Sequence, residues 1–156
     1  CDWSSDVCSS DLMRKIPEFV VNIVSMDLIE QMNFSSGDFP PEEDEFEWAE
    51  LTKVPAAKVR PPRVGEAKAH LECKVMQIVD DNNTHIVLGR IVHAHVSKAV
   101  WKNGRIDPRL LDPACRLSGS AYAQLGEIVN VARPVWADLK GTPKGTAKMP
   151  RMVKRK

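Results

Sequence analysis

Two long strand-forming segments separated by a short polar turn constrain the fold of this chain more than any other feature. Residues 69–79 alternate between apolar and polar side chains, and residues 84–96 are rich in Ile and Val. Such alternation is typical of a strand with one buried face, and the intervening Asp-Asp-Asn-Asn of residues 80–83 has the composition of a turn. The sequence therefore predicts a long β-hairpin, and Gly89 in its second strand predicts a bulge or a close approach by another backbone or a ligand.

The alternation in residues 69–79 also predicts which side chains of the first strand are buried. We expect an apolar, buried face and a polar, exposed one. The apolar face would hold Leu71, Cys73, Val75 and Val79, and the polar face His70, Glu72 and Lys74.

The remaining elements are predicted to be short. Residues 18–24 form an apolar, β-branched run of strand length, and Ser25 is placed to begin a helix that continues to Met32. Residues 102–105 predict a turn, after which Asp107 and Pro108 begin a short helix to Leu111; residues 128–131 predict a last strand. Many short strands with few helices favour a mainly β fold, a β-barrel or sandwich, over alternating βα units.

The first twelve residues, Cys1–Leu12, have a separate origin in our interpretation. Residues 2–12 back-translate without a mismatch to an oligonucleotide that resembles a short-read sequencing adapter. We therefore treat residues 1–12 as an artefact, exclude them from the fold, and expect residues 13–139 to form an incomplete domain. Met13 need not be the start of the natural protein.

Composition limits the classes of protein that remain. Residues 13–156 suit one domain, 43% of the chain is hydrophobic, and no apolar run approaches the roughly 20 residues of a membrane span. Two cysteines, Cys73 and Cys115, remain once the first twelve residues are removed; we expect both to be buried, small apolar residues. A reducing, cytoplasmic location fits this cysteine usage.

The C-terminal residues 140–156 hold seven basic residues and no acidic one. With four Gly or Pro residues and few apolar ones, this tail cannot bury enough surface to offset the entropy of ordering, so we expect disorder. A nucleic-acid-binding or membrane-surface arm is the alternative. We favour a solvated C-terminal tail and predict that it binds neither nucleic acid nor a membrane.

His93 and His95 are the first candidates for chemistry. They are two residues apart on a predicted strand, so both side chains should leave from one face, together with the apolar Val87 and Ile91. A metal site needs a third and a fourth ligand at suitable spacing, and the sequence offers none, so we predict no metal. His93 could line a cofactor or nicotinamide pocket, or both histidines could be structural.

The segment from Cys115 to Tyr122 is the second candidate. Arg116, Ser118, Ser120 and Tyr122 supply a guanidinium, two hydroxyls and an aromatic edge, a set that suits an anionic, planar ligand. The chain carries no Walker loop, GxGxxG, nucleophile elbow or HExxH motif, which removes the usual sequence support for nucleotide hydrolysis, a Rossmann domain and common hydrolases.

In order along the chain, a set of short stretches resembles the C-terminal two thirds of the flavin reductase-like family, FMN-binding proteins with a split β-barrel. The resemblance runs from about Arg14 to Pro134. Its stretches are Glu18-Phe19-Val20-Val21-Asn22, Met32-Asn33, Phe39-Pro40-Pro41, Asp44-Glu45-Phe46, Pro61-Pro62-Arg63-Val64, Leu71-Glu72-Cys73, Gly89-Arg90-Ile91-Val92-His93-Ala94-His95-Val96, Gly104-Arg105-Ile106-Asp107-Pro108, Leu111-Asp112-Pro113 and Arg116-Leu117-Ser118-Gly119-Ser120-Ala121-Tyr122. Ser118 stands where relatives often have Gly.

The resemblance implies an NAD(P)H-dependent FMN reductase, a homodimer with FMN near the subunit interface, that supplies reduced flavin to a flavin-dependent monooxygenase. An FMN-binding electron-transfer protein and a split-barrel binding domain without flavin are the alternatives. The resemblance further implies that much of the FMN cradle precedes Met13, so that the barrel is incomplete at its N-terminus. We therefore assign the reductase activity to the parent protein and expect this fragment to be impaired.

Among the residues present, the resemblance and the residue types together assign four to cofactor binding. Arg116, Ser120 and Tyr122 would lie near the flavin or across the dimer interface, and His93 would line the flavin or nicotinamide side. The flavin carries the hydride chemistry in such proteins, so no catalytic side chain is assigned.

Overall fold

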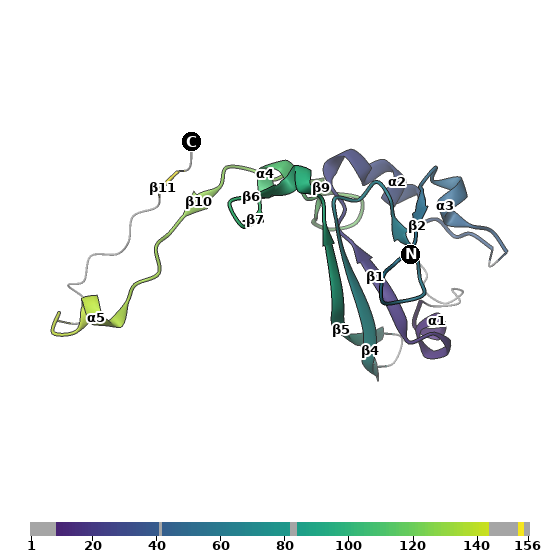
Figure 1. Ribbon diagram of the computed structural model, residues 1–156, viewed down its shortest axis with the longest axis horizontal. Helices are drawn as coiled ribbons and strands as arrows, with labels where there is room; N and C mark the ends of the chain where they lie inside the picture. Colours follow the sequence, from purple (N-terminus) through teal and green to yellow (C-terminus); the bar gives the residue numbers. More distant parts are fainter. Residues whose placement is uncertain (1–8, 41, 82–83, 144–152, 155–156) are drawn as a thin grey trace. The chain divides into compact units, whose positions relative to one another are not determined.

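The predicted hairpin is the centre of the observed structure. In the computed structural model, strands β4 (Ala69–Asp81) and β5 (Thr84–Val96) pair in antiparallel fashion, and β1 (Glu18–Asn22) pairs with the other side of β4. The sheet order is therefore β1-β4-β5, with β4 in the middle (Figure 1). The structure describes residues 9–40, 42–81, 84–143 and 153–154. The predicted turn at residues 80–83 thus lies partly outside the described residues.

Gly89 lies beside a register shift, as predicted, but the group that approaches it closely is the Phe19 side chain rather than another backbone or a ligand. A Cβ atom at this position would lie 2.5 Å from Cζ of Phe19 and 3.4 Å from Cβ of Cys73, well inside van der Waals contact with the Phe19 ring. The register of β4 and β5 also shifts twice, between Glu72 and Cys73 and between Val75 and Gln77. Bulges of this kind twist a hairpin locally and redirect side chains.

The prediction that the polar face of β4 is exposed was wrong. His70 and Glu72 are buried, with 5% and 0% of their surfaces exposed, whereas Val79 on the expected buried face is 38% exposed. The reason is long-range: the segment of residues 57–64 covers the polar face and bonds to it. Cys73 is buried and Lys74 exposed, as predicted.

The prediction for the neighbours of His93 was also wrong. Paired residues share a face of a sheet, and His93 pairs with Glu72 while Ile91 pairs with the next residue, Cys73. Consecutive residues of β4 point to opposite faces, so Ile91 lies on the face opposite His93. The register shift therefore creates a polar face around Glu72 and an apolar face around Cys73.

The helices are short, and their first residues follow from local signals. Ser25 occupies the predicted start of a helical segment, but its hydroxyl bonds to the carboxylate of Asp27 and does not cap the helix. The caps at Asp44 and Asp107 accept from the N–H of Phe46 and Arg109, at 3.1 and 3.0 Å. The helical elements are α1 (Ser9–Lys15), η1 (Met26–Leu28), α2 (Ile29–Phe34), α3 (Glu45–Trp48), η2 (Lys98–Val100) and α4 (Pro108–Leu111).

Three two-stranded ribbons accompany the main sheet. They pair β2 (Lys53–Val54) with β3 (Arg63–Val64), β6 (Trp101–Lys102) with β7 (Arg105–Ile106), and β8 (Cys115–Arg116) with β9 (Tyr122–Ala123). The turn between β6 and β7 confirms the prediction for residues 102–105. Asn103 and Gly104 both have positive φ, +51° and +75°, as a tight two-residue hairpin loop requires.

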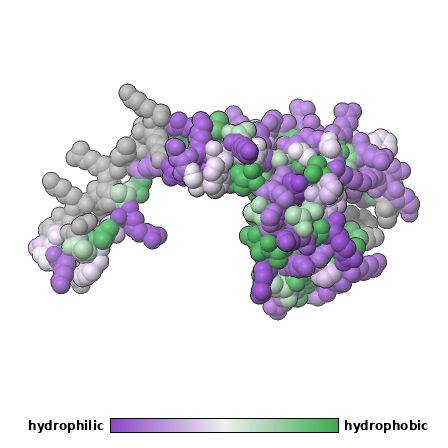
Figure 2. Space-filling view, viewed as in Figure 1, coloured by the Kyte–Doolittle hydropathy of each residue, from purple (hydrophilic) through white to green (hydrophobic). Residues whose placement is uncertain are grey.

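The described core is small, and the sheet leaves apolar side chains in solvent. The buried apolar residues are Ala49, Ala67, Ala69, Cys73 and Val100. Apolar side chains are visible on the surface over the β4–β5 hairpin (Figure 2); the exposed ones there are Met76, Val79, Ile86, Leu88 and Ile91. Cys115 is exposed, contrary to expectation, as are both residues of the short strand β8.

Residues 125–156 form a second unit, described here by itself. It contains α5 (Trp136–Leu139) and a ribbon of β10 (Val129–Asn130) with β11 (Val153–Lys154). The predicted strand at residues 128–131 is confirmed by β10. Residues 144–152 and 155–156 of the basic tail lie outside the described residues, so its disorder stays a prediction. Among the described helices, none has the length and apolar character needed to cross a membrane.

Candidate functional site

Arg116 and Tyr122 come together in the β8–β9 ribbon. Arg116 pairs with Tyr122 across the ribbon, and its Nη1 donates to the hydroxyl of Tyr122 at 3.0 Å. Its Nη2 donates to the carbonyl of Gly119 at 2.9 Å, and the guanidinium carbon lies 5.4 Å from the centroid of the Tyr122 ring. Gly119 has φ +56°, in the left-handed region that suits glycine in this turn.

In this arrangement the guanidinium of Arg116 is oriented and still has donors with which to bind an anion. Arg116 is exposed, and two of its five N–H donors are used on Tyr122 and Gly119, which leaves three within the described part of the chain. A phosphate or carboxylate could therefore bind to Arg116 without breaking the bonds that orient it. Ser120 is exposed in the same turn, so three of the four predicted site residues lie together.

His93 lies elsewhere, on the main sheet. Its ring packs edge-on against that of His95, with 4.5 Å between centroids, and it is half-buried. No hydrogen bond or ring contact joins His93 to the 115–123 ribbon among the described residues. The structure thus confirms that His93 and His95 share a face, but it does not bring His93 to Arg116.

Glu72 is the centre of a buried polar network that sequence reasoning missed. One carboxylate oxygen accepts from the N–H of Ala57 at 2.7 Å and from Nε2 of His95 at 2.5 Å; the other accepts from the N–H of Lys58 at 2.6 Å. Burial by itself raises the pKa of this carboxyl, but the hydrogen bonds outweigh it and lower the pKa to about 2. Glu72 is therefore a carboxylate at neutral pH.

His70 extends the network on the same face. Its Nε2 bonds to the carbonyl of Val64 at 2.8 Å, so Nε2 carries the proton. Its Nδ1 is buried and has no hydrogen-bond partner among the described residues. Burial lowers the pKa of His70, which keeps the ring neutral.

The polar face of the sheet binds the backbone of the covering segment at further points. Glu18 accepts from the N–H of Arg60 at 3.0 Å and from its Nε at 3.2 Å, and Asn22 accepts from the N–H of Val64 at 2.9 Å. Arg60 lies outside the described strands, so Glu18 satisfies an N–H group that no strand ladder bonds.

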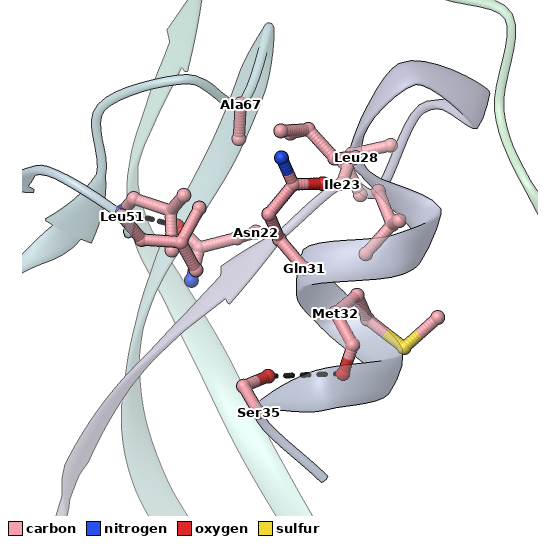
Figure 3. Close-up of a pocket in the computed structure, with 10 residues that line it drawn as sticks. Asn22, Ile23, Leu28, Gln31, Met32, Ser35, Leu51 and Ala67 are labelled. Carbon is pink, nitrogen blue, oxygen red and sulfur yellow. Dashed lines mark hydrogen bonds between the residues drawn. The ribbon is translucent and has the colours of Figure 1, made fainter. Parts of the chain in front are cut away.

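The segment of residues 57–64, which covers the polar face of the sheet, contributes to the lining of two cavities. The larger has a volume of about 650 Å³, within the range of small-molecule sites, and Arg60, Pro61, Pro62 and Val64 form one side of it. The smaller has about 230 Å³ and lies between α2 and the end of β1, where the Gln31 side chain points toward Asn22 and Ala67 (Figure 3). Neither is lined by the four predicted site residues.

A match to a known protein family shows to which family this chain belongs. The model of the flavin reductase like domain matches residues 6–109. The chain belongs to this family. The matched range begins inside Cys1–Leu12, and the adapter origin of that segment stays a prediction.

The chain is also similar to individual proteins and to solved structures. An uncharacterized protein of Halalkalibacterium halodurans is 37% identical over 127 residues, which are 78% of this chain and 61% of that protein. The crystal structure of nitrilotriacetate monooxygenase component B from Bacillus cereus superposes with a TM-score of 0.71 at 31% identity, covering 77% of this chain and 62% of that one. The chain thus spans about three fifths of these relatives.

A more distant structure supports the fold. A Shewanella frigidimarina protein described as having a split barrel domain superposes with a TM-score of 0.73 at 22% identity, over 81% of this chain and 65% of that one. The mainly β, split-barrel fold predicted from the sequence is therefore confirmed, and the three-stranded sheet with its ribbons is the part of that fold described here.

Proposed function

We propose that this chain is part of an NAD(P)H-dependent flavin reductase that transfers a hydride from NAD(P)H to FMN. The observation that carries the proposal is the match of residues 6–109 to the flavin reductase like domain. A flavin supplies the hydride-accepting chemistry when bound, so the protein has to bind, orient and shield it. We propose no catalytic side chain.

The β8–β9 ribbon suits the anionic part of a flavin nucleotide. Arg116 offers three N–H donors on a guanidinium already fixed by Tyr122 and Gly119. Because little side-chain entropy is left to lose, binding a phosphate there costs less than at a mobile arginine. We propose that Arg116, Ser120 and Tyr122 contact the FMN, in one subunit or across a dimer interface.

His93 is proposed to line the flavin or nicotinamide side. Its ring is half-buried against His95, which is fixed by Glu72, so its orientation is set before any ligand arrives. A pre-oriented imidazole can donate to, or accept from, a polar edge of either cofactor ring.

The proposed partners follow from the family relationship. We propose a homodimer in the cytoplasm that passes reduced flavin to a flavin-dependent monooxygenase. Support comes from the 31% identity to a protein named as a monooxygenase component B.

The test uses the full-length protein to which this chain belongs. FMN and FAD are titrated by flavin fluorescence, and oxidation of NADH and NADPH is followed by absorbance with each flavin present. We expect FMN binding and flavin-dependent oxidation of a reduced nicotinamide. Tight FMN binding with slow oxidation would instead indicate an electron-transfer protein. Failure to bind either flavin would leave a split-barrel binding domain and refute the proposal.

A further inference from the structure

The carboxylate of Glu72 joins two parts of the molecule: the segment that leads into the wall of the larger cavity, and the pair of His95 and His93. On one side it bonds to the backbone of residues 57–58, which lead into the wall of the larger cavity. On the other side it bonds to His95, whose ring supports His93. We propose that Glu72 is a positioning residue that fixes the cavity wall and His93 in one geometry. The inference rests on the proposed flavin reductase function.

Glu72 holds the beginning of the wall through two backbone N–H groups, those of Ala57 and Lys58. Ala57 and Lys58 precede Arg60, Pro61 and Pro62, the three consecutive residues of the segment that line the larger cavity. Glu72 holds the first end of this stretch, and Glu18 holds Arg60. Two consecutive prolines stiffen the stretch between the bound Arg60 and Val64, so a shift at residues 57–58 moves the wall as a unit.

His93 depends on Glu72 through His95. The 2.5 Å bond to Glu72 fixes the plane of the His95 ring and places a proton on Nε2. His93 meets that ring edge-on, with 4.5 Å between centroids and an interplanar angle of 69°, and the His70 ring also meets it edge-on, at 6.0 Å. A rotation of His95 would therefore displace His93.

Only a carboxylate satisfies this site. Three donors converge on two oxygens: the N–H of Ala57, the N–H of Lys58 and Nε2 of His95. An amide at position 72 has one acceptor oxygen, and its NH₂ group would face a donor. Glu72→Gln keeps the size of the side chain, so it tests the charge and the acceptor count rather than the packing.

The experiment compares Glu72→Gln with two other variants of the same chain. His95→Gln removes the imidazole but leaves the bonds to Ala57 and Lys58. Glu66→Gln is the matched control, because Glu66 also binds a backbone N–H, that of Thr52, at 3.0 and 3.1 Å, but it is exposed and lines neither cavity. Amide hydrogen exchange of residues 57–62 and the NMR signals of the His93 ring are measured without flavin.

We expect Glu72→Gln to lose exchange protection at Ala57 and Lys58 and to shift the His93 signals. His95→Gln should shift the His93 signals alone, and Glu66→Gln should change neither. With FMN present, Glu72→Gln should raise the Kd for FMN by roughly tenfold at temperatures well below its melting point, the loss of about one charge-assisted hydrogen bond.

Unchanged protection and unchanged His93 signals in Glu72→Gln would overturn the inference, and so would an unchanged Kd for FMN in a folded variant. If Glu72→Gln does not fold, His95→Gln decides: unchanged His93 signals overturn the inference. The exchange and NMR measurements need no ligand. Failure of the unsubstituted full-length protein to bind flavin would therefore refute the proposed function separately from the coupling.

Discussion

The ring of Phe19 in β1 reaches across β4 and fills the space that a side chain at position 89 of β5 would occupy. The Cβ of an alanine there would lie 2.5 Å from Cζ of Phe19. Because Phe19 carries the contact between the two outer strands, the absence of a side chain at Gly89 is a condition for the order β1-β4-β5.

Gly89→Ala should therefore destabilise the protein. Phe19 would have to leave its position, and overpacking of this kind costs about 1–3 kcal/mol. Urea unfolding measures the change. Gly126→Ala is the control, since a Cβ at Gly126 meets nothing within 4 Å and its φ is not positive. Equal stability of the two variants would contradict the prediction.

Arg116→Ala should weaken FMN binding. Loss of a charge-assisted hydrogen bond to a phosphate costs about 1.5–3 kcal/mol, which corresponds to a roughly tenfold to hundredfold higher Kd. Fluorescence titration measures it, with Arg105→Ala on the exposed β7 as the matched control. Arg116→Lys should recover only part of the affinity, because lysine cannot bond to Tyr122 and Gly119 in the same fork. An unchanged Kd in Arg116→Ala would remove this residue from the site.

Stability should fall in acid through Glu72. Its folded-state pKa of about 2 is below the ordinary value of 4.5, so its contribution is complete above about pH 5 and is lost as the pH falls toward 2. Urea midpoints measured across this window should decrease. The decrease should be smaller in Glu72→Gln, which has no carboxyl to protonate; an identical pH profile in the two proteins would argue against a buried, ionised Glu72.

Asp107→Ala should destabilise α4 by about 1 kcal/mol. The carboxylate accepts from the N–H of Arg109 at 3.0 Å, and Pro108 fixes the first helical residue. Thermal unfolding measures the change. Asp107→Asn retains an acceptor and should stay within a few tenths of a kcal/mol of the unsubstituted chain. If both variants lose the same stability, the charge rather than the cap is responsible.

Local signals account for the parts of the fold that the sequence predicts well. The strands of the hairpin, the cap at Asp107 and the Asn103-Gly104 turn each depend on residues within a few positions of one another. The Arg116–Tyr122 contact belongs to the same class, because the two residues are separated by six positions and a single turn.

The burial of Glu72 could not be predicted in this way. Its backbone partners, Ala57 and Lys58, are 15 and 14 residues away, and they contribute N–H groups that every non-proline residue has. A signal was present nonetheless: His70 and Glu72 alternate with the apolar residues of β4, close to a proline-containing segment with no strand pattern of its own. The face of Ile91 was missed because one extra residue in β5 changes the pairing from Glu72 to Cys73.

The bonds between the sheet and the 57–64 segment also bear on mutational tolerance. At Ala57, Lys58 and Val64 the sheet holds main-chain atoms and not side chains, so many substitutions there would keep every bond. The side chains that hold them, Glu72 and Asn22, have no such freedom. A saturation-mutagenesis map should therefore show that many substitutions are tolerated in the 57–64 segment and few at Glu72 and Asn22. Substitutions in the segment could then change the specificity of the cavity without altering the sheet that holds it.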